Sequence, residues 1–486
     1  MAGPLIDRMR SAVAANPAAP AFIFQDKVVT HGQFLALVRE TARLFHERGI
    51  RPGDAVALSM GRWPMHCVAM LALARLGALS VPLGPNLAAD AKAAILARFG
   101  ARALVTNWDP GGVKLPIVVT LQTISANEDA PEPDLGGFVP DEDTPLRVAL
   151  TSGTTGVPRG VLHTHGSFAD RIDKTLHECD ASTRLLPPDL HITVGMVFAI
   201  GVLLRGGTVV FDRTFIPRDM ADAIRLYGVT HFLLSPAAVP SMAAALPAEG
   251  LAFPSLRHLR IVGATPASAM LELLRTRFSP NVYLPYGLTE IGVVSLATPE
   301  TLADHPGSAG RISPWARVEI VDADGRVLPP GATGEIRVAV DGMPAGYYRE
   351  DAREAKSSKF RGGWFHPGDL GRISPEGLLF IEGRTDDVVN VGGHKVSLAF
   401  LDAVIGESAG VRSAVTFAID ADGGTALGAA VVLDAGQERG DLAAWVQERV
   451  ALPTPIRIFE VDAIARDDMG KVNRAAVRAK AMGGLP

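Results

Sequence analysis

The sequence predicts an α/β protein with a large N-terminal domain and a small α+β C-terminal domain. Over most of the chain, short apolar runs alternate with helical patterns, which is typical of parallel strands covered by helices. After about residue 306, runs appear in which apolar and polar residues alternate one by one, as in antiparallel sheet. We therefore expect several subdomains in residues 1–384, with parallel sheets and an antiparallel, barrel-like part.

The first parallel unit begins with the apolar run Ala55–Met60, which predicts a strand. His66–Leu76 has the spacing of a helix, and Gly77 follows as its stop signal. Ala78–Leu83 predicts the next strand. The same rhythm returns further along the chain at Gly207–Phe211, Met220–Tyr227 and His231–Leu234.

The antiparallel part is indicated by period-two patterns and by turn signals such as Asp324-Gly325. These patterns cover Val318–Val321, Gly334–Val340 and Gly377–Glu382. Earlier in the chain, the acidic and proline-rich stretch Asn127–Thr144 is expected to lack regular structure.

The C-terminal residues restart the mixed pattern and predict a separate domain. We place the joint near Arg384–Asp387, so that the expected domains are 1–384 and 385–486. The elements expected after the joint are a strand at Val388–Val391, a helix near Leu398–Ile405, and strands near Ala414–Ile419 and Ala426–Leu433.

Composition argues against several classes of protein. Of the 486 residues, 48% are hydrophobic and 20% are charged, and the formal net charge of -5 argues against a nucleic-acid partner. Cys67 and Cys179 are too few for a disulfide framework and favour a reducing compartment. The most apolar stretches, Cys67–Leu73 and Ile192–Leu204, are too short or too interrupted to span a bilayer, and no signal peptide is recognisable. We expect a soluble cytoplasmic protein, monomeric or homodimeric.

A loop rich in glycine and hydroxyl residues follows the expected strand Arg147–Leu150. It comprises Thr151, Ser152, Gly153, Thr154, Thr155, Gly156, Val157, Pro158, Arg159 and Gly160. Glycines let the backbone turn N–H groups toward one point, and Arg159 adds a positive charge, a combination that suits a polyphosphate. The Gly-Lys-Ser/Thr of a Walker A loop is missing. A polar surface turn is the alternative, which the preceding strand and Arg159 disfavour.

This loop resembles the phosphate-loop signature of the adenylate-forming, or AMP-binding, superfamily. That superfamily includes acyl- and aryl-CoA ligases, the adenylation domains of peptide synthetases, and luciferases. Resemblances continue in the family's order at Leu150–Gly166, Tyr286–Glu290, Trp364–Gly371, Gly383–Lys395 and Gly470–Arg474. Several matches in one order are much more specific than any of them alone.

The resemblance implies roles for residues around the nucleotide. Tyr286 would stack on adenine, Thr289 would lie beside the α-phosphate, and Glu290 would ligate Mg²⁺. Asp369 would accept hydrogen bonds from the ribose hydroxyls, and Arg384 would bind the same ribose from the other side. The hydroxyl residues and glycines of the phosphate loop, together with Arg159, would bind the phosphates.

Three further features belong to the expected nucleotide site. The turn Gly263-Ala264-Thr265 could contact the adenine edge and leave room for the acid, although a generic strand-to-helix turn would look the same. Lys471 is implied to reach the reacting carboxylate and phosphate from the C-terminal domain. The chain departs from the family at Arg159, where lysine is usual, and at Pro367, where threonine is usual.

The expected acid pocket begins at His191, which the resemblance places beside the tunnel between acid and thiol; a surface or core histidine is the alternative. Thr193 stands where members that activate amino acids have an aspartate, so an α-amino acid is disfavoured. We expect an uncharged aromatic or medium aliphatic acid. The pocket would be lined by His191, Met196, Phe198, Ser235, Ala237, Gly263, Gly287 and Leu288.

The acceptor is expected to be coenzyme A. Gly392, Gly393, His394 and Lys395 would lie along its pantetheine arm. Asp386 matches the family's hinge, about which a mobile C-terminal domain would rotate.

The expected function is therefore ATP- and Mg²⁺-dependent activation of a carboxylic acid through an acyl-adenylate, followed by transfer to coenzyme A with release of AMP and pyrophosphate. Lys471, Glu290, Thr289 and His191 would carry the catalysis. One alternative is a stand-alone adenylating enzyme that loads a carrier protein. An alternative of another class is an inactive AMP-binding scaffold.

Overall fold

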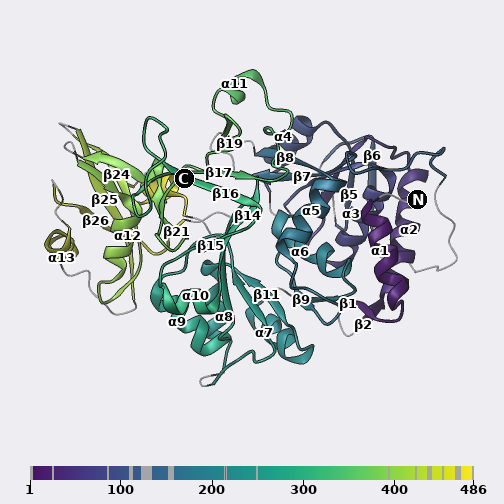
Figure 1. Cartoon of the computed structure of the whole chain (residues 1–486), viewed down its shortest axis with the longest axis horizontal. Coiled ribbons are helices and arrows are strands. Elements are labelled where there is room, and N and C mark those ends of the chain that lie inside the picture. Colours follow the sequence, from purple (N-terminus) through teal and green to yellow (C-terminus); the bar gives the residue numbers. More distant parts are fainter. Residues whose placement is uncertain are drawn as a thin grey trace.

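The computed structural model describes residues 4–24, 27–84, 87–108, 113–121, 134–151, 158–212, 214, 216–247, 250–391, 394–421, 424–434, 441–450, 452, 454–465 and 472–483. Figure 1 shows two lobes built from the N-terminal and middle parts of the chain, and a further lobe built from the C-terminal strands. Within the described ranges, no helix is both long and apolar enough to cross a lipid bilayer.

The first sheet is six-stranded, in the order β6-β5-β3-β4-β7-β8. Its strands are β3 (Ala55–Ser59), β4 (Leu79–Pro82), β5 (Ala101–Thr106), β6 (Ile117–Thr120), β7 (Pro145–Thr151) and β8 (Arg159–Thr164). Neighbouring strands pair in parallel except β7 and β8, which are antiparallel. The parallel strands expected at the start of the chain are confirmed, and the helix between them ends at Gly77 in a left-handed conformation (φ +66°).

The second sheet begins with parallel strands. They are β1 (Pro20–Phe24), β10 (Thr208–Phe211), β9 (Arg184–Leu186), β11 (His231–Leu234), β12 (His258–Ile261) and β13 (Val282–Leu288), with β2 (Lys27–Thr30) antiparallel at the edge beyond β1. His231 of β11 pairs with His258 of β12, and Leu259 of β12 pairs with Val282 of β13. Because these strands run in the same direction, their carboxyl ends meet at one edge of the sheet.

The antiparallel part continues this second sheet and does not form the barrel-like unit predicted from the sequence. After β13 the order is β14 (Gly292–Ala297), β15 (Gly310–Ile312), β21 (Leu378–Arg384), β20 (Asp369–Ile373), β17 (Gly334–Val340), β19 (Trp364–Phe365) and β18 (Phe360–Arg361), with β16 (Ala316–Val321) beside β17. The described strands of this sheet form one open, 15-stranded sheet. The physical reason is that β13 pairs in parallel with β12 and antiparallel with β14, so the antiparallel strands extend the parallel sheet.

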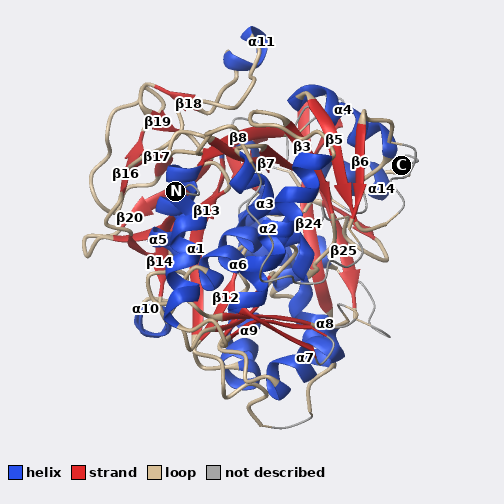
Figure 2. Ribbon diagram, turned by 90° about the vertical axis from the view of Figure 1, so that its right-hand side faces the viewer, coloured by secondary structure: helices blue, strands red, loops and turns tan. Residues whose placement is uncertain are grey.

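Some helices of this part pack between the two sheets, whereas α11 (Ala352–Ala355) extends away from them (Figure 2). The helices of this part are α1 (Pro4–Ala15), α2 (His31–Glu47), α3 (Pro64–Leu76), α4 (Ala89–Phe99), α5 (His165–Thr175), α6 (Thr193–Leu203), α7 (Pro217–Leu226), α8 (Val239–Ala244), α9 (Ser268–Leu273), α10 (Pro299–Asp304) and α11 (Ala352–Ala355). Helix α2 begins with a capping box, in which the Thr30 side chain accepts from the Gln33 N–H and the Gln33 side chain accepts from the Thr30 N–H.

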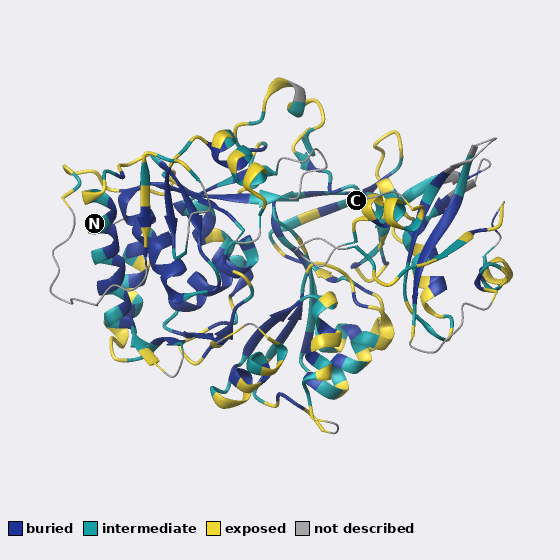
Figure 3. Cartoon of the chain, turned by 180° about the vertical axis from the view of Figure 1, so that it is seen from behind, coloured by how far each residue is buried: buried dark blue, intermediate teal, exposed yellow. Residues whose placement is uncertain are grey.

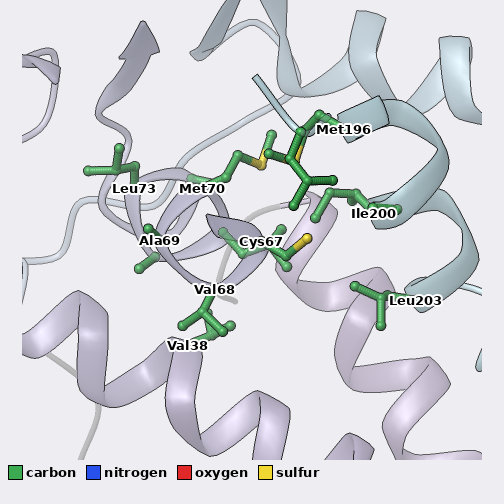
Figure 4. Close-up of a cluster of buried hydrophobic side chains, with 14 of the residues drawn as sticks. Val38, Cys67, Val68, Ala69, Met70, Leu73, Met196, Ile200 and Leu203 are labelled. Atoms are coloured by element: carbon green, nitrogen blue, oxygen red, sulfur yellow. The ribbon is translucent and has the colours of Figure 1, made fainter. Parts of the chain in front are cut away.

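The main apolar core lies around α3, whose residues are all buried. It joins α3 to α2, α6 and inner faces of both sheets. Figure 4 shows Cys67 and Met70 of α3 among Val38, Met196 and Ile200. Cys67 is buried and has a free thiol, which is typical of a core cysteine. Figure 3 shows that buried residues concentrate in these inner elements.

The C-terminal part has its own apolar cluster and its own sheets. Its strands are β22 (Val388–Val391), β23 (His394–Ser397), β24 (Val411–Ala421), β25 (Gly424–Leu433) and β26 (Arg457–Glu460), and its helices are α12 (Leu398–Gly406), α13 (Leu442–Arg449) and α14 (Arg474–Ala481). The helix and strands expected here are present. The domain boundary expected after Arg384 stays a prediction; it coincides with the end of β21.

Candidate functional site

The centre of the candidate site is a contact between three residues that the sequence placed around ribose and adenine. The Tyr286 hydroxyl on β13 donates to Asp369 Oδ2 at 2.6 Å, and Arg384 Nη1 donates to Asp369 Oδ1 at 3.1 Å. Asp369 starts β20 and Arg384 ends β21, and the two residues are paired across the strands. Burial, followed by the charge of Asp369, raises the pKa of Tyr286, so its hydroxyl stays a donor.

The turn before Asp369 brings two cations to one carbonyl. Gly368 has φ +78°, a conformation that favours glycine. The carbonyl oxygen of Pro367 accepts from Arg384 Nη2 at 3.3 Å and from Lys359 Nζ at 2.8 Å. Lys359 was not identified from the sequence, because an isolated lysine before a short hairpin carries no pattern that distinguishes it from a solvated charge.

Glu290, the expected Mg²⁺ ligand, is nearly buried and held by a tyrosine. The Tyr347 hydroxyl donates to Glu290 Oε1 at 3.1 Å, and burial together with the Glu290 charge raises the pKa of Tyr347. Arg171 of α5 donates to the carbonyls of Thr289 at 2.8 Å and Leu288 at 3.1 Å, which fixes the turn that carries Glu290. Burial lowers the pKa of Arg171 to about 10, and the Glu290 charge opposes this. Local sequence patterns mark neither Tyr347 nor Arg171.

Arg159 lies at the start of β8 and is bound by the segment that leads to the β18–β19 hairpin. Its Nη2 donates to Ser357 Oγ at 2.8 Å, and its Nη1 lies 3.8 Å from Glu350 Oε1. Its guanidinium also lies 5.1 Å from the ring centre of Tyr347. Through Tyr347, the cation expected in the phosphate loop is therefore connected to Glu290. Thr151 ends β7, and its hydroxyl donates to the Arg159 carbonyl at 3.4 Å.

The expected adenine and acid positions gather at the carboxyl ends of β11, β12 and β13. Ser235 follows β11, while Gly263, Ala264 and Thr265 follow β12 and are exposed. Gly263 has φ +95°, which favours glycine in this turn. A Cβ on Gly287 would lie 2.7 Å from the Gly292 carbonyl oxygen, so this close approach also requires glycine.

His191 is half-buried, and a fully buried arginine holds its backbone. Arg147 Nη2 donates to the carbonyls of Leu190 at 3.2 Å and His191 at 3.0 Å. A Cβ on Gly84 would lie 3.5 Å from His191 Nε2, so β4 ends close to this imidazole. Met196, expected to line the acid pocket, is fully buried in the apolar core (Figure 4).

Several predicted site residues lie outside the described part of the chain. They are Ser152, Gly153, Thr154, Thr155 and Gly156 of the phosphate loop, Gly392 and Gly393 of the coenzyme A segment, and Lys471. His394 and Lys395 begin β23, but their side chains are not described. Asp386 lies in the helical turn Thr385–Asp387 that follows β21.

A second group of metal-ligating residue types occurs among the described residues, away from this site. One ligand atom each of Glu178, His231 and His258 lies within 4.8 Å of the others. Arg260 already binds Glu178, and the two imidazole rings stack at 4.6 Å with planes only 15° apart, so their in-plane lone pairs do not converge. The histidines begin β11 and β12, at the edge opposite Ser235 and Gly263.

Comparison with known proteins gives this geometry a context. The family described as AMP-binding enzyme matches residues 9–348. The chain is 30% identical to fatty acid–[acyl-carrier-protein] ligase ScoC of Streptomyces coeruleorubidus, over 96% of this chain and 94% of that protein. It is 31% identical to 2-succinylbenzoate–CoA ligase of Bacillus velezensis, over 94% of each. The solved structure of amide bond synthetase McbA from Marinactinospora thermotolerans is 28% identical, with a TM-score of 0.85 over 98% of this chain and 100% of that one.

Proposed function

Because the chain belongs to the AMP-binding enzyme family, we propose that it activates a carboxylic acid with ATP and transfers the acyl group to coenzyme A. The observation that carries this proposal is the contact of Tyr286, Asp369 and Arg384, which joins an aromatic ring, a carboxylate for ribose hydroxyls and a cation. An inactive scaffold is disfavoured because Glu290 lies in the same part of the sheet with its own ordered partners.

In the first half-reaction, a carboxylate oxygen of the acid attacks the α-phosphorus of ATP. The bond from the α-phosphorus to the bridging oxygen breaks, and pyrophosphate leaves with that oxygen. Both reactants are anions, so alignment and positive charge are the main requirements. Arg384 would supply one positive charge, and Lys471, which lies outside the described part of the chain, would supply another. Glu290 fits a hard metal ion because carboxylate oxygens are preferred Mg²⁺ ligands, and bound Mg²⁺ would neutralise phosphate charge.

In the second half-reaction, the thiolate sulfur attacks the acyl carbon, the carbon–oxygen bond to the phosphate breaks, and AMP leaves. His191 is proposed to border the route between acid and thiol. Gly392 and Gly393 would let the pantetheine arm pass close to the backbone. The 2-succinylbenzoate–CoA ligase relative supports coenzyme A as the acceptor. The carrier-protein ligase ScoC, similar over nearly the same length, favours transfer to a carrier protein as the second candidate.

The acid is proposed to be an uncharged aromatic or medium aliphatic one. Thr193, where an ammonium-binding aspartate would stand, is mostly buried at the start of α6. Met196 and Phe198, on the same helix, are also buried and apolar. These residues offer no anionic partner for a substrate ammonium, so α-amino acids are expected to react poorly.

The test is ATP-dependent release of pyrophosphate across a panel of aromatic, aliphatic and α-amino acids, each with and without coenzyme A. Formation of an acyl-AMP with one acid class, followed by AMP release that depends on coenzyme A, is the expected result. AMP release that requires a phosphopantetheinylated carrier protein instead would select the second candidate. Absence of pyrophosphate release with every acid, while AMP still binds, would favour the scaffold.

A further inference from the structure

We propose that Lys359 is a further nucleotide-contacting residue, whose ammonium group binds the α-phosphate of ATP, of the acyl-adenylate and of AMP. The inference rests on the proposed function and adds a cation that the sequence motifs do not include. Lys359 directly precedes the β18–β19 hairpin. Its carbonyl accepts from the His366 N–H at 2.8 Å, so the lysine lies opposite the residues that lead into Asp369.

The side chain of Lys359 is directed to the nucleotide site. Its Nζ donates to the Pro367 carbonyl at 2.8 Å, and the same carbonyl accepts from Arg384. An ammonium group has three donors, and one of them is used here. Among the described residues, Lys359 Nζ forms no further hydrogen bond, so two donors can reach phosphate oxygens.

Four charged groups influence the pKa of this ammonium group through their charges. Arg384 comes from β21 and Asp369 from β20, while Glu290 follows β13 and Asp386 lies in the turn after β21. Asp369 is the proposed ribose ligand and Glu290 the proposed metal ligand. In a bound nucleotide, the α-phosphate lies between the ribose and the metal-bound phosphate oxygens. Lys359 and Arg384 donate to the same Pro367 carbonyl, and Arg384 also donates to Asp369, so the ammonium group lies beside the proposed ribose ligand, where the α-phosphate attached to that ribose is expected.

The burial of Lys359 agrees with this role. The side chain is half-buried, and burial followed by the nearby Arg384 lowers its pKa. A phosphate anion beside the ammonium would stabilise its charged form. Pro367, which stands where threonine is usual in the family, has no hydroxyl to donate. The Lys359 ammonium group supplies a hydrogen-bond donor beside Pro367, where the chain lacks that hydroxyl.

Lys359 and Lys471 belong to different parts of the chain. Lys359 belongs to the part of the chain that carries Asp369 and Glu290, whereas Lys471 belongs to the C-terminal segment proposed to rotate. Lys359 should therefore hold the phosphate in both half-reactions, and it should contribute to the affinity for AMP in the absence of the acid.

The experiment measures binding of AMP and of adenosine to the wild type, K359M and K359R by calorimetry. K356M is the matched control, because Lys356 lies three residues earlier and is exposed. Loss of a charge-assisted hydrogen bond should weaken AMP binding to K359M by about tenfold to a hundredfold. Adenosine binding should be unchanged in all variants, and K359R should recover part of the AMP affinity.

Each outcome has a definite meaning. Equal weakening of AMP and adenosine binding in K359M would overturn the phosphate contact, because the lysine would then act through the hairpin or Arg384. Unchanged AMP binding in K359M would also overturn it. If the wild type bound neither ligand, the proposed function would fall together with the inference. Retained adenosine binding shows that a variant is folded, so loss of AMP binding cannot be ascribed to unfolding.

Discussion

At the scale of single residues, Asp369 shows how the site is prepared before a nucleotide arrives. Both carboxylate oxygens are already engaged, one by the Tyr286 hydroxyl and one by Arg384. A carboxylate has about four lone-pair positions, so ribose hydroxyls can still donate to it. The bond to Asp369 also fixes the Tyr286 ring, which removes conformational freedom that stacking on adenine would otherwise have to restrict.

A prediction at this scale concerns Glu290. Glu290→Gln removes one formal charge from the proposed metal site, so the Mg²⁺ concentration for half-maximal pyrophosphate release should rise on the order of tenfold or more. Tyr347→Phe is the matched control, since it removes the hydroxyl donor to Glu290 and leaves the charge. Its shift should be much smaller. Identical Mg²⁺ titrations for the wild type and Glu290→Gln would remove Glu290 from the ligands.

At the scale of elements, helix α6 connects core packing to the proposed acid pocket. Its apolar residues pack against α3, while its first turn lies against the segment that ends at His191. Gly195 permits this approach, because a Cβ there would lie 2.1 Å from the Asp189 carbonyl oxygen and 3.2 Å from that of Pro188. The position of His191 therefore depends on a small residue in the helix.

Gly195→Ala is accordingly expected to displace the segment from Pro188 to His191. We predict a loss of about 1–3 kcal/mol in the free energy of unfolding and a raised KM for the acid. Gly201→Ala, on the same helix, is the control, because its Cβ would meet the flexible side chain of Leu176 and not backbone. It should reduce stability with little change in KM. The measurements are urea denaturation and initial rates; an unchanged KM in Gly195→Ala would separate α6 from the acid site.

Elements with strong local patterns were predicted well from the sequence, and contacts between distant segments were not. The strand at His231–Leu234 and the stop at Gly77 are encoded locally, by an apolar run and by a glycine that adopts positive φ. Tyr286 and Asp369 were predicted as site residues because they lie in sequence motifs. Lys359 was not predicted, because its proposed role depends on how the hairpin folds beside β20. The prediction of a barrel-like part was wrong. Alternation of apolar and polar residues with a period of two does not reveal which strands lie at the two edges of a sheet.

At the scale of the whole molecule, buried histidines couple stability to pH. Burial lowers the pKa of His66 to about 3, with Arg147 as the next cause, and burial also lowers the pKa of His231 to about 3 and those of His165 and His258 to about 4. In the unfolded chain these groups titrate near their ordinary value of about 6.5. At pH values between the folded pKa values and about 6.5, the unfolded state therefore binds more protons than the folded state.

The free energy of unfolding should therefore be highest above about pH 6.5, as far as these histidines determine it, and fall as the pH is lowered toward 4. Denaturant titrations at several pH values measure this slope. His66→Leu should reduce the slope by up to one proton, about 1.4 kcal/mol per pH unit. A slope that is unchanged in His66→Leu, or stability that does not vary with pH in this window, would contradict the prediction.

The final prediction concerns the movement proposed between the two half-reactions. The proposed reaction requires Lys471 at the phosphate in the first and Gly393 beside the pantetheine arm in the second, so the C-terminal domain would have to present two faces. Asp386 lies in the short helical turn that leaves β21, whose last residue, Arg384, also contacts Asp369. The proposed pivot thus lies two residues after Arg384, one of the proposed ribose-binding residues. Proline at 386 would fix φ there, remove an N–H and restrict Thr385 before it.

Asp386→Pro is expected to retain acyl-AMP formation and to lose most of the transfer to coenzyme A, by about tenfold or more, since a hinge absorbs a large change in backbone dihedrals. Asp386→Ala is the matched control, because it removes the carboxylate and leaves φ free. It should transfer at nearly the wild-type rate, so that loss in Asp386→Pro alone is assigned to the backbone. The measurement is single-turnover formation of acyl-AMP, followed by its decay when coenzyme A is added. Equal decay in all three proteins would place the hinge elsewhere, whereas equal loss in both variants would assign the effect to the carboxylate, whose charge raises the pKa of Lys359.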